Sequence, residues 1–162
     1  MSAPTLLRGR AVAADDYGRI DDDAPIAMGS RVIVSLARWL REHDELATKA
    51  EAVGVALPCD RLPSDVPALD RLALVAIELP RFTDGRAYSI ARMLRDRYGF
   101  RGELRATGHV LRDQLRYLER CGFDAFELAP GQSPERAIEA FAEHKTTYQA
   151  AADTPLPHYR RR

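Results

Sequence analysis

Four side chains that could bind a small molecule or act on it lie within short apolar segments of the sequence. They are Glu78, Arg105, His109 and Glu127. Arg105 is the most unusual of them, because parallel strands normally consist of nearly continuous apolar runs. A buried guanidinium group needs a carboxylate partner, since leaving it unpaired costs about 3–5 kcal/mol. Glu78 and Glu127 are the candidate partners, so these residues predict a salt-bridged network on a sheet face, an anion site centred on Arg105, or both.

His109 stands at the end of its apolar segment, where a strand is predicted to be followed by a helix. Histidine exchanges protons near neutral pH, so an imidazole at this position could act as a general acid or base. The alternative is a capping or surface histidine. Glu78, Arg105, His109 and Glu127 are therefore the candidate catalytic residues, and the sequence assigns no individual role to them.

The stretch PRFTDGRAYS predicts a second anion-binding site, at a turn from strand to helix. Thr83 or Asp84 would cap the helix, whose N-terminus offers free N–H groups and a partial positive charge. Arg81 and Arg86 flank that position and could clamp an oxyanion through paired hydrogen bonds. Gly85 would let a ligand approach the backbone. The alternative is a well-capped helix that carries surface arginines.

Metal and cofactor motifs are not found in the sequence. Cys59 and Cys121 are far apart and match no C-x-x-C pattern, and no histidine has a second ligand at a suitable spacing. The chain also contains no GxGxxG after a strand, no P-loop and no GxSxG elbow. We therefore predict no metal site and no nicotinamide, flavin or nucleotide cofactor.

Apolar runs and helical periodicity alternate along most of the chain. The predicted strands are 31–36, 53–58, 72–79, 103–109 and 124–129, and the predicted helices are 36–50, 84–99, 110–122 and 133–149. Such alternation predicts an α/β fold of repeated βα units around a small parallel sheet. The units are too few for a closed eight-stranded barrel. We expect an open sheet or a half-barrel, similar to a fragment of a TIM barrel, that a second subunit could complete.

Strand alternation decides which of these side chains share a face, because successive residues of a strand point to opposite sides. The apolar face of each strand should meet the helices. Glu78, Arg105, Thr107, His109 and Glu127 should then gather on the other face, near the carboxyl ends of the strands. Ligands of α/β proteins bind at these ends.

A chain of 162 residues is long enough for one domain with a core. We expect an irregular or short-stranded lead-in at 1–30, a single α/β domain at 31–150 and a flexible tail at 151–162. Lys+Arg and Asp+Glu are equal at 24 each, so no basic surface for nucleic acid is predicted. No apolar stretch approaches the roughly 18 residues of a membrane span, and no secretory signal is recognisable. The composition favours a reduced, cytoplasmic protein, and the few strands and polar sheet face favour a homodimer.

Residues 82–128 carry, in this order, the blocks FTDGR, GELRA-x-G, V-L-R-D-Q and RCGFDAF, and RVIVSLARWL and VGVALP precede them. In content and order the four blocks resemble a bacterial family known as domain of unknown function 934, and the two upstream segments resemble its first half. Members are usually encoded beside assimilatory sulfite reductase, and they are often labelled as oxidoreductases of sulfite reduction. The resemblance therefore implies a role in sulfur assimilation, but it assigns no catalytic residue.

Three functions fit these observations. The first is an accessory protein of sulfite reduction that binds a small sulfur oxyanion or the reductase itself. The second is an enzyme that acts on a small anionic substrate with Glu78, Arg105 and Glu127. The third is a structural or regulatory dimer in which these charges form buried salt bridges. The sequence leaves open whether the protein is an enzyme.

Overall fold

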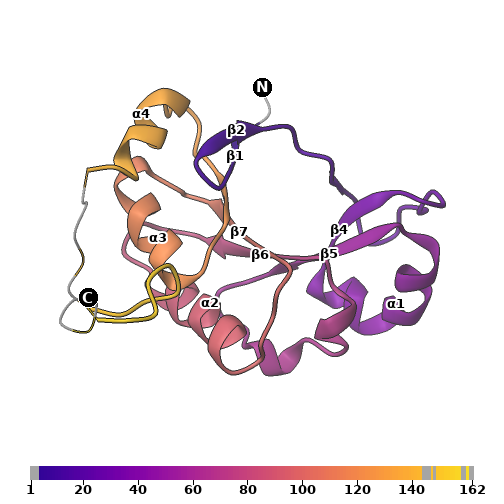
Figure 1. Cartoon of the computed structure of the whole chain (residues 1–162). Helices are drawn as coiled ribbons and strands as arrows, with labels where there is room; N and C mark the ends of the chain where they lie inside the picture. The colour runs from indigo at the N-terminus through magenta and orange to yellow at the C-terminus, as the bar shows by residue number, and fades with distance from the viewer. Residues whose placement is uncertain (1–3, 144–146, 148, 158–159, 161–162) are drawn as a thin grey trace.

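The protein is a curled α/β half-barrel. A computed structural model describes residues 4–143, 147, 149–157 and 160. Within these residues, eight strands form one sheet in the order β2-β1-β8-β7-β6-β5-β4-β3. Figure 1 shows the helices along the outer side of the curl. The predicted α/β fold with a half-barrel sheet is confirmed.

Six neighbouring strands of the sheet, β3 to β8, run parallel. The five of them predicted from apolar runs are β4 (Arg31–Ser35), β5 (Ala52–Leu57), β6 (Leu74–Leu79), β7 (Glu103–Gly108) and β8 (Ala125–Glu127). Each predicted boundary lies within two residues of the observed one. Short β-branched and apolar runs between turn residues are therefore sufficient to locate this part of the sheet.

Three strands precede these five and lie within the predicted lead-in. They are β1 (Leu6–Arg8), β2 (Ala11–Ala13) and β3 (Gly18–Arg19). β1 pairs antiparallel with both β2 and β8, whereas β3 pairs parallel with β4. The lead-in is thus short-stranded and belongs to the sheet. The sheet is larger than predicted and mixed, because the buried side chains Leu6 and Leu7 add a hairpin to its β8 edge.

The hairpin creates an unusual connection across the sheet. β2 and β3 follow one another in the chain but lie at opposite edges of the sheet. Residues 14–17, which we call the strap, join them and cross the open side of the curl (Figure 1). The strap therefore covers the inner face, which is the sheet face opposite the helices.

Four α-helices and three short 3-10 helices connect the strands of the described chain. They are α1 (Leu36–Lys49), η1 (Pro63–Asp65), η2 (Leu69–Arg71), α2 (Arg86–Asp96), η3 (Arg112–Gln114), α3 (Leu115–Cys121) and α4 (Pro134–Ala140). The Ser133 side chain accepts a hydrogen bond from the Arg136 N–H at the start of α4, and Gly122 ends α3 in a left-handed conformation. The helix predicted at 133–149 is shorter than expected, and residues 144–146 and 148 lie outside the described chain. None of the described helices is long and apolar enough to cross a membrane.

The main core lies between the sheet and the helices. Val75, Ile77 and Leu79 of β6 belong to it, as strand alternation predicted, and Trp39 of α1 is fully buried there. A second, much smaller apolar cluster on the inner face consists of Ile33, Leu74 and Ala76, with Tyr17 and Ala56 packed against it. Because most of the inner face is polar or has small side chains, it leaves room for a pocket.

Candidate functional site

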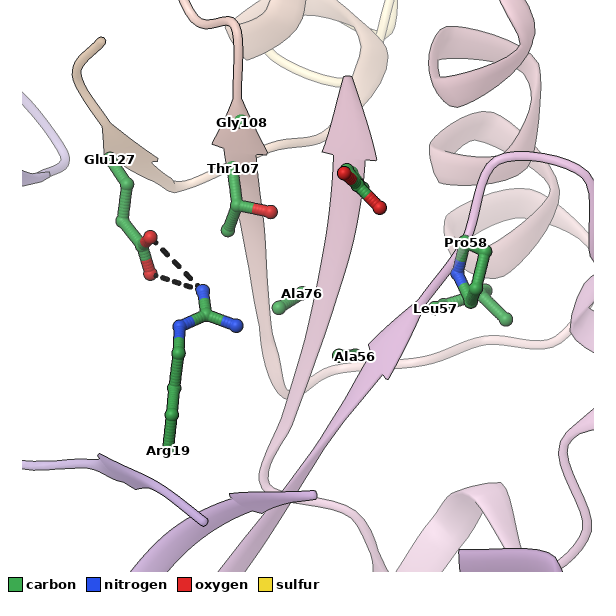
Figure 2. A pocket seen from close by; sticks show the side chains of 9 residues that line it. Arg19, Ala56, Leu57, Pro58, Ala76, Thr107, Gly108 and Glu127 are labelled. Atoms are coloured by element: carbon green, nitrogen blue, oxygen red, sulfur yellow. Dashed lines mark hydrogen bonds and ion pairs between the residues drawn. The ribbon is translucent and has the colours of Figure 1, made fainter. Parts of the chain in front are cut away.

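A pocket of about 350 Å³ opens on the inner face at the carboxyl ends of the parallel strands (Figure 2). We call it the mouth pocket. It is lined by Arg19, Ala56, Leu57, Pro58, Ala76, Glu78, Thr107, Gly108 and Glu127. The methyl side chains of Ala56 and Ala76 leave the centre of the sheet uncovered. Ligand sites in proteins typically enclose about 300–1,000 Å³, so the pocket has room for a small molecule.

Glu78 is the one carboxylate of the pocket that no basic group neutralises. Its side chain is exposed, and it makes no hydrogen bond or ion pair within the described chain. Thr107 lies directly beside it in the register of β6 and β7. The Thr107 hydroxyl donates only a long hydrogen bond of 3.4 Å to the Ile77 carbonyl. A carboxylate and a hydroxyl are therefore available to a ligand side by side.

Glu127 is held by an arginine from the far edge of the sheet. The Arg19 Nη2 atom of β3 donates to both carboxylate oxygens of Glu127, at 2.9 and 3.0 Å (Figure 2). The Glu127 side chain is largely buried, whereas the Arg19 side chain is half-exposed. The pair spans the curl of the sheet and closes one side of the mouth pocket.

Arg105 is fully buried on the inner face and lies two residues before Thr107 on β7. Its Nε atom donates to Glu103 at 2.7 Å, and its Nη1 atom donates to Asp15 of the strap at 2.7 Å and to Glu127 at 3.2 Å. Its guanidinium carbon lies 5.7 Å from the centre of the Tyr17 ring, a cation–π contact. Its Nη2 atom is buried without a hydrogen-bond partner.

These contacts correct the predicted partners of Arg105. Glu127 is a partner, as predicted, but Glu78 is not, because its carboxylate remains exposed at the pocket. Asp15 and Glu103 were missed. Glu103 lies two residues before Arg105, so the period of two along a strand already placed both on one face. No pattern in the sequence around Asp15 predicts its pairing with Arg105, because the two residues meet only where the strap crosses the sheet.

Arg105 is the centre of a chain of alternating charges that we call the inner-face network. Its members are Arg8, Glu103, Arg105, Glu127 and Arg19, in that spatial order. Burial by itself would lower the pKa of Arg105, but its hydrogen bonds to the carboxylates of Asp15 and Glu103 more than offset burial and raise the pKa. The guanidinium therefore stays charged although it is buried.

The FTDGR block forms a separate hollow of about 450 Å³ at the start of α2. It is lined by Pro80, Arg81, Thr83, Asp84, Gly85 and Arg86. The Arg86 side chain binds the Asp84 carboxylate through Nε at 3.0 Å and Nη2 at 2.6 Å, and its backbone N–H donates to the same carboxylate at 3.2 Å. The N-cap of α2 is Gly85 and has no side-chain capping hydrogen bond, so neither Thr83 nor Asp84 is the predicted cap. Asp84 instead accepts from the first N–H of the helix and occupies the guanidinium predicted to clamp an anion. The Arg81 side chain is exposed and makes no hydrogen bond or ion pair within the described residues.

Asp84 also contacts Cys59 from the loop after β5. The Cys59 thiol donates to Asp84 at 3.5 Å. Hydrogen bonds from Arg86 lower the pKa of Asp84, whereas burial and then Asp84 itself raise the pKa of the Cys59 thiol. Both effects favour the protonated thiol over the thiolate, which is the nucleophilic form of cysteine.

His109 lies outside the mouth pocket. It follows β7 and is exposed, and its backbone N–H donates to the Leu79 carbonyl at 2.8 Å. No hydrogen bond of its ring is present within the described chain. Among the described residues, no three His, Cys, Asp or Glu side chains converge as metal ligands would. His144 and His158 lie outside the described residues.

The fold and the site define an α/β half-barrel protein with a polar pocket at the carboxyl ends of its parallel strands. The sequence matches a family model described as a bacterial protein of unknown function (DUF934) over residues 54–159. This range is more than half of the chain, and the chain belongs to that family. A comparison with curated proteins found no match.

Proposed function

We propose that the protein binds a small polar molecule in the mouth pocket and serves as an accessory protein of sulfite reduction. The observation that carries the binding proposal is the unpaired carboxylate of Glu78 in an open pocket at the strand ends. α/β proteins hold their ligands at this position. An exposed carboxylate beside a hydroxyl that makes only one long hydrogen bond suits a ligand with an ammonium group or another hydrogen-bond donor.

The role in sulfite reduction is supported by the family resemblance and the gene neighbourhood that it implies. The same resemblance supports sulfite reductase as a partner and the cytoplasm as the location. Mixing the protein with sulfite reductase at micromolar concentration tests the partner. Co-elution in size-exclusion chromatography is expected, and elution of two separate peaks at that concentration contradicts it.

Thermal unfolding in the presence of small molecules tests the binding proposal. The panel consists of taurine, β-alanine, serine, sulfite, sulfate and phosphate. A ligand at a hundred times its dissociation constant adds about 2.7 kcal/mol to the free energy of unfolding. This corresponds to a rise in Tm of about 5–11 °C for a chain of this size.

Glu78→Gln should remove the shift that an amine-bearing ligand causes, because a neutral amide attracts a cation less than a carboxylate does. Glu139→Gln is the matched control, since Glu139 is exposed on α4, away from the pocket, and has no side-chain partner in the described structure. The proposal fails if none of the six compounds shifts Tm, or if the shift is the same in Glu78→Gln as in the unchanged protein.

An enzyme acting on a small substrate is the second candidate function, because Glu78 has no bound proton donor and could accept a proton. In that case Glu78→Gln would abolish conversion of the ligand, as followed by NMR of the ligand signals. An unchanged ligand spectrum after long incubation with the unmodified protein would exclude turnover of that compound and leave the binding function.

A further inference from the structure

We propose that Arg105 is an anion subsite of the mouth pocket and that Asp15 of the strap occupies it in this structure. This inference rests on the proposed function and names its ligand class. The ligand is a small zwitterion, with a carboxylate, sulfonate or sulfate group on Arg105 and an ammonium group on Glu78. Binding replaces the Asp15 carboxylate and lifts the strap.

The charge balance on the inner face singles out Asp15. Glu103 is shared with Arg8, and Glu127 is shared with Arg19. Asp15, by contrast, has no other basic partner in the described structure. Without Asp15, the inner-face network holds three arginines and two glutamates, which leaves one positive charge. An incoming anion can therefore take the place of Asp15 with no other rearrangement of charge.

The guanidinium of Arg105 also has unused hydrogen-bonding capacity. Its Nη2 atom is buried and has no partner, while Nη1 already serves two carboxylates. Buried donors are almost always satisfied, so an unsatisfied one calls for an explanation. An oxyanion with two free oxygens can bind a guanidinium through two nitrogens at once, which a single oxygen of Asp15 does not do.

Arg105 adjoins the floor of the mouth pocket. Its register partner on β6 is Ala76, and Thr107 follows two residues later on the same face of β7. Both residues line the pocket, and so does Glu127, whose carboxylate Arg105 contacts. Strand geometry places the backbones of Arg105 and Glu78 about 8 Å apart, since they are offset by one strand and two residues. A molecule the size of an amino acid spans this distance between the two side chains.

The strap is held in a way that permits displacement. The Asp15 side chain is 37% exposed, although the Arg105 side chain that it covers is 0% exposed. Residues 14–16 are exposed, and the strand that follows the strap pairs over only two residues. Segments with few buried apolar contacts open at low free-energy cost. Tyr17 is the one partly buried residue of the strap, and it packs against Arg105.

Calorimetric titration of sulfate into Asp15→Asn tests the inference. We expect at least about tenfold tighter sulfate binding than in the unmodified protein, because sulfate no longer has to displace a carboxylate from the buried guanidinium of Arg105. Asp16→Asn is the matched control, since Asp16 is the next residue of the strap and pairs with Arg31 instead. Adding Arg105→Lys to Asp15→Asn should cancel most of the gain, because an ammonium group lacks the planar fork.

Three results would overturn the inference: no gain in Asp15→Asn, an equal gain in Asp16→Asn, or a gain that survives Arg105→Lys. Glu78→Gln separates this test from that of the proposed function. It should weaken taurine binding while leaving the effect of Asp15→Asn on sulfate intact. If Glu78→Gln leaves taurine binding unchanged, the proposed function is overturned. If Asp15→Asn does not tighten sulfate binding, the Asp15 inference is overturned.

A second measurement applies if Asp15→Asn does not fold. The backbone N–H of Tyr17 donates to the Asp15 carboxylate at 3.1 Å. Release of Asp15 from Arg105 frees its carboxylate to rotate and exposes this N–H to water, so hydrogen exchange at Tyr17 in the unmodified protein should become faster in 100 mM taurine. Unchanged or slower exchange at Tyr17, with Tm raised by taurine, would overturn the inference.

Discussion

At the scale of single residues, Arg105 shows how a buried charge is tolerated. Taking a guanidinium out of water is costly, and the three carboxylates around it compensate that cost through short contacts of 2.7–3.2 Å. The compensation is mutual, because the positive charge of Arg105 also stabilises the largely buried carboxylates of Glu103 and Glu127. Removing the central charge therefore leaves Asp15 without a basic partner and takes one of two basic partners from Glu103 and from Glu127.

We predict that Arg105→Met lowers the free energy of unfolding by about 3–5 kcal/mol, the usual result of breaking a buried pair from one side. Methionine fills a similar volume, so the loss reports charge rather than packing. Urea denaturation measures it. Arg136→Met is the control, since Arg136 is exposed and its side chain has no partner in the described structure, and it should change stability by less than about 0.5 kcal/mol. A loss of under about 1 kcal/mol for Arg105→Met would mean that the network does not stabilise the fold.

Asp84 gives a prediction about acid stability. Hydrogen bonds from Arg86 lower its pKa in the folded protein, so the stabilisation is present above the unfolded pKa of about 3.9 and is lost as pH falls through the folded pKa. Asp84→Asn removes this contribution. Stability should then fall less steeply below about pH 4 than in the unmodified protein.

Urea midpoints measured across the acid range check this prediction. Asp23→Asn serves as the comparison, because Asp23 is exposed and has no hydrogen bond or ion pair in the described chain. Parallel acid profiles for Asp84→Asn and the unmodified protein would show that the pair with Arg86 contributes nothing.

At the scale of elements, the ends of the parallel strands shape the mouth pocket. β7 ends at Gly108 with a φ of 85°, and the next residue returns its backbone N–H to the Leu79 carbonyl at the end of β6. A Cβ atom on Gly108 would lie 2.7 Å from the Leu79 carbonyl oxygen. The turn that borders the pocket therefore requires glycine for two separate reasons.

Gly108→Ala and Gly131→Ala together separate these two reasons. Gly131 has a similar φ of 82°, but a Cβ atom added to it would meet no other atom within 4 Å, so Gly131→Ala reports backbone strain alone, about 1–2 kcal/mol. We expect Gly108→Ala to cost about 1–3 kcal/mol more, because it adds a clash with backbone. Chemical denaturation of both variants checks the order, and equal losses would contradict the predicted clash.

The strands and helices differ in how well the sequence alone predicts them. The strands from β4 to β8 and the helices follow from apolar runs and periodicity, because each lies in a run of at least six residues that carries a pattern. β8 itself has only three residues, but it lies within the run 124–129. β1, β2 and β3 have only two or three residues each, too few for any period. Arg86 and Asp84 are two residues apart, so their ion pair could have been predicted from the sequence as the alternative to an anion held by Arg86. The contact of Asp15 with Arg105 could not have been predicted, because it depends on the order of the strands in the sheet.

At the scale of the whole molecule, the strap bears on the oligomeric state. The sequence favoured a homodimer partly because a half-barrel would leave a polar sheet face open. In the structure, residues of the same chain cover that face. A homodimer is therefore not needed to bury Arg105, although it stays a prediction.

Light scattering coupled to size-exclusion chromatography checks the homodimer. The expected mass is twice the chain mass of 18.1 kDa. The measurement should be made across a hundredfold range of concentration, because dimers dissociate on dilution. A mass of one chain at the highest concentration would contradict the dimer.

The pairing of β1 with β8 also has a consequence for the order of events during synthesis. Arg19 and Glu127 are 108 residues apart in the chain, and β1 reaches its neighbour β8 over a similar span. The hairpin of β1 and β2 is synthesised well before β8 and must wait for β8 before it can join the sheet. Domains with such distant contacts fold slowly, and the distant contacts form late.

Pulse-labelled hydrogen exchange during refolding should find the backbone N–H groups of β5, β6 and β7 protected before those of β1. Simultaneous protection of all four strands would contradict this order.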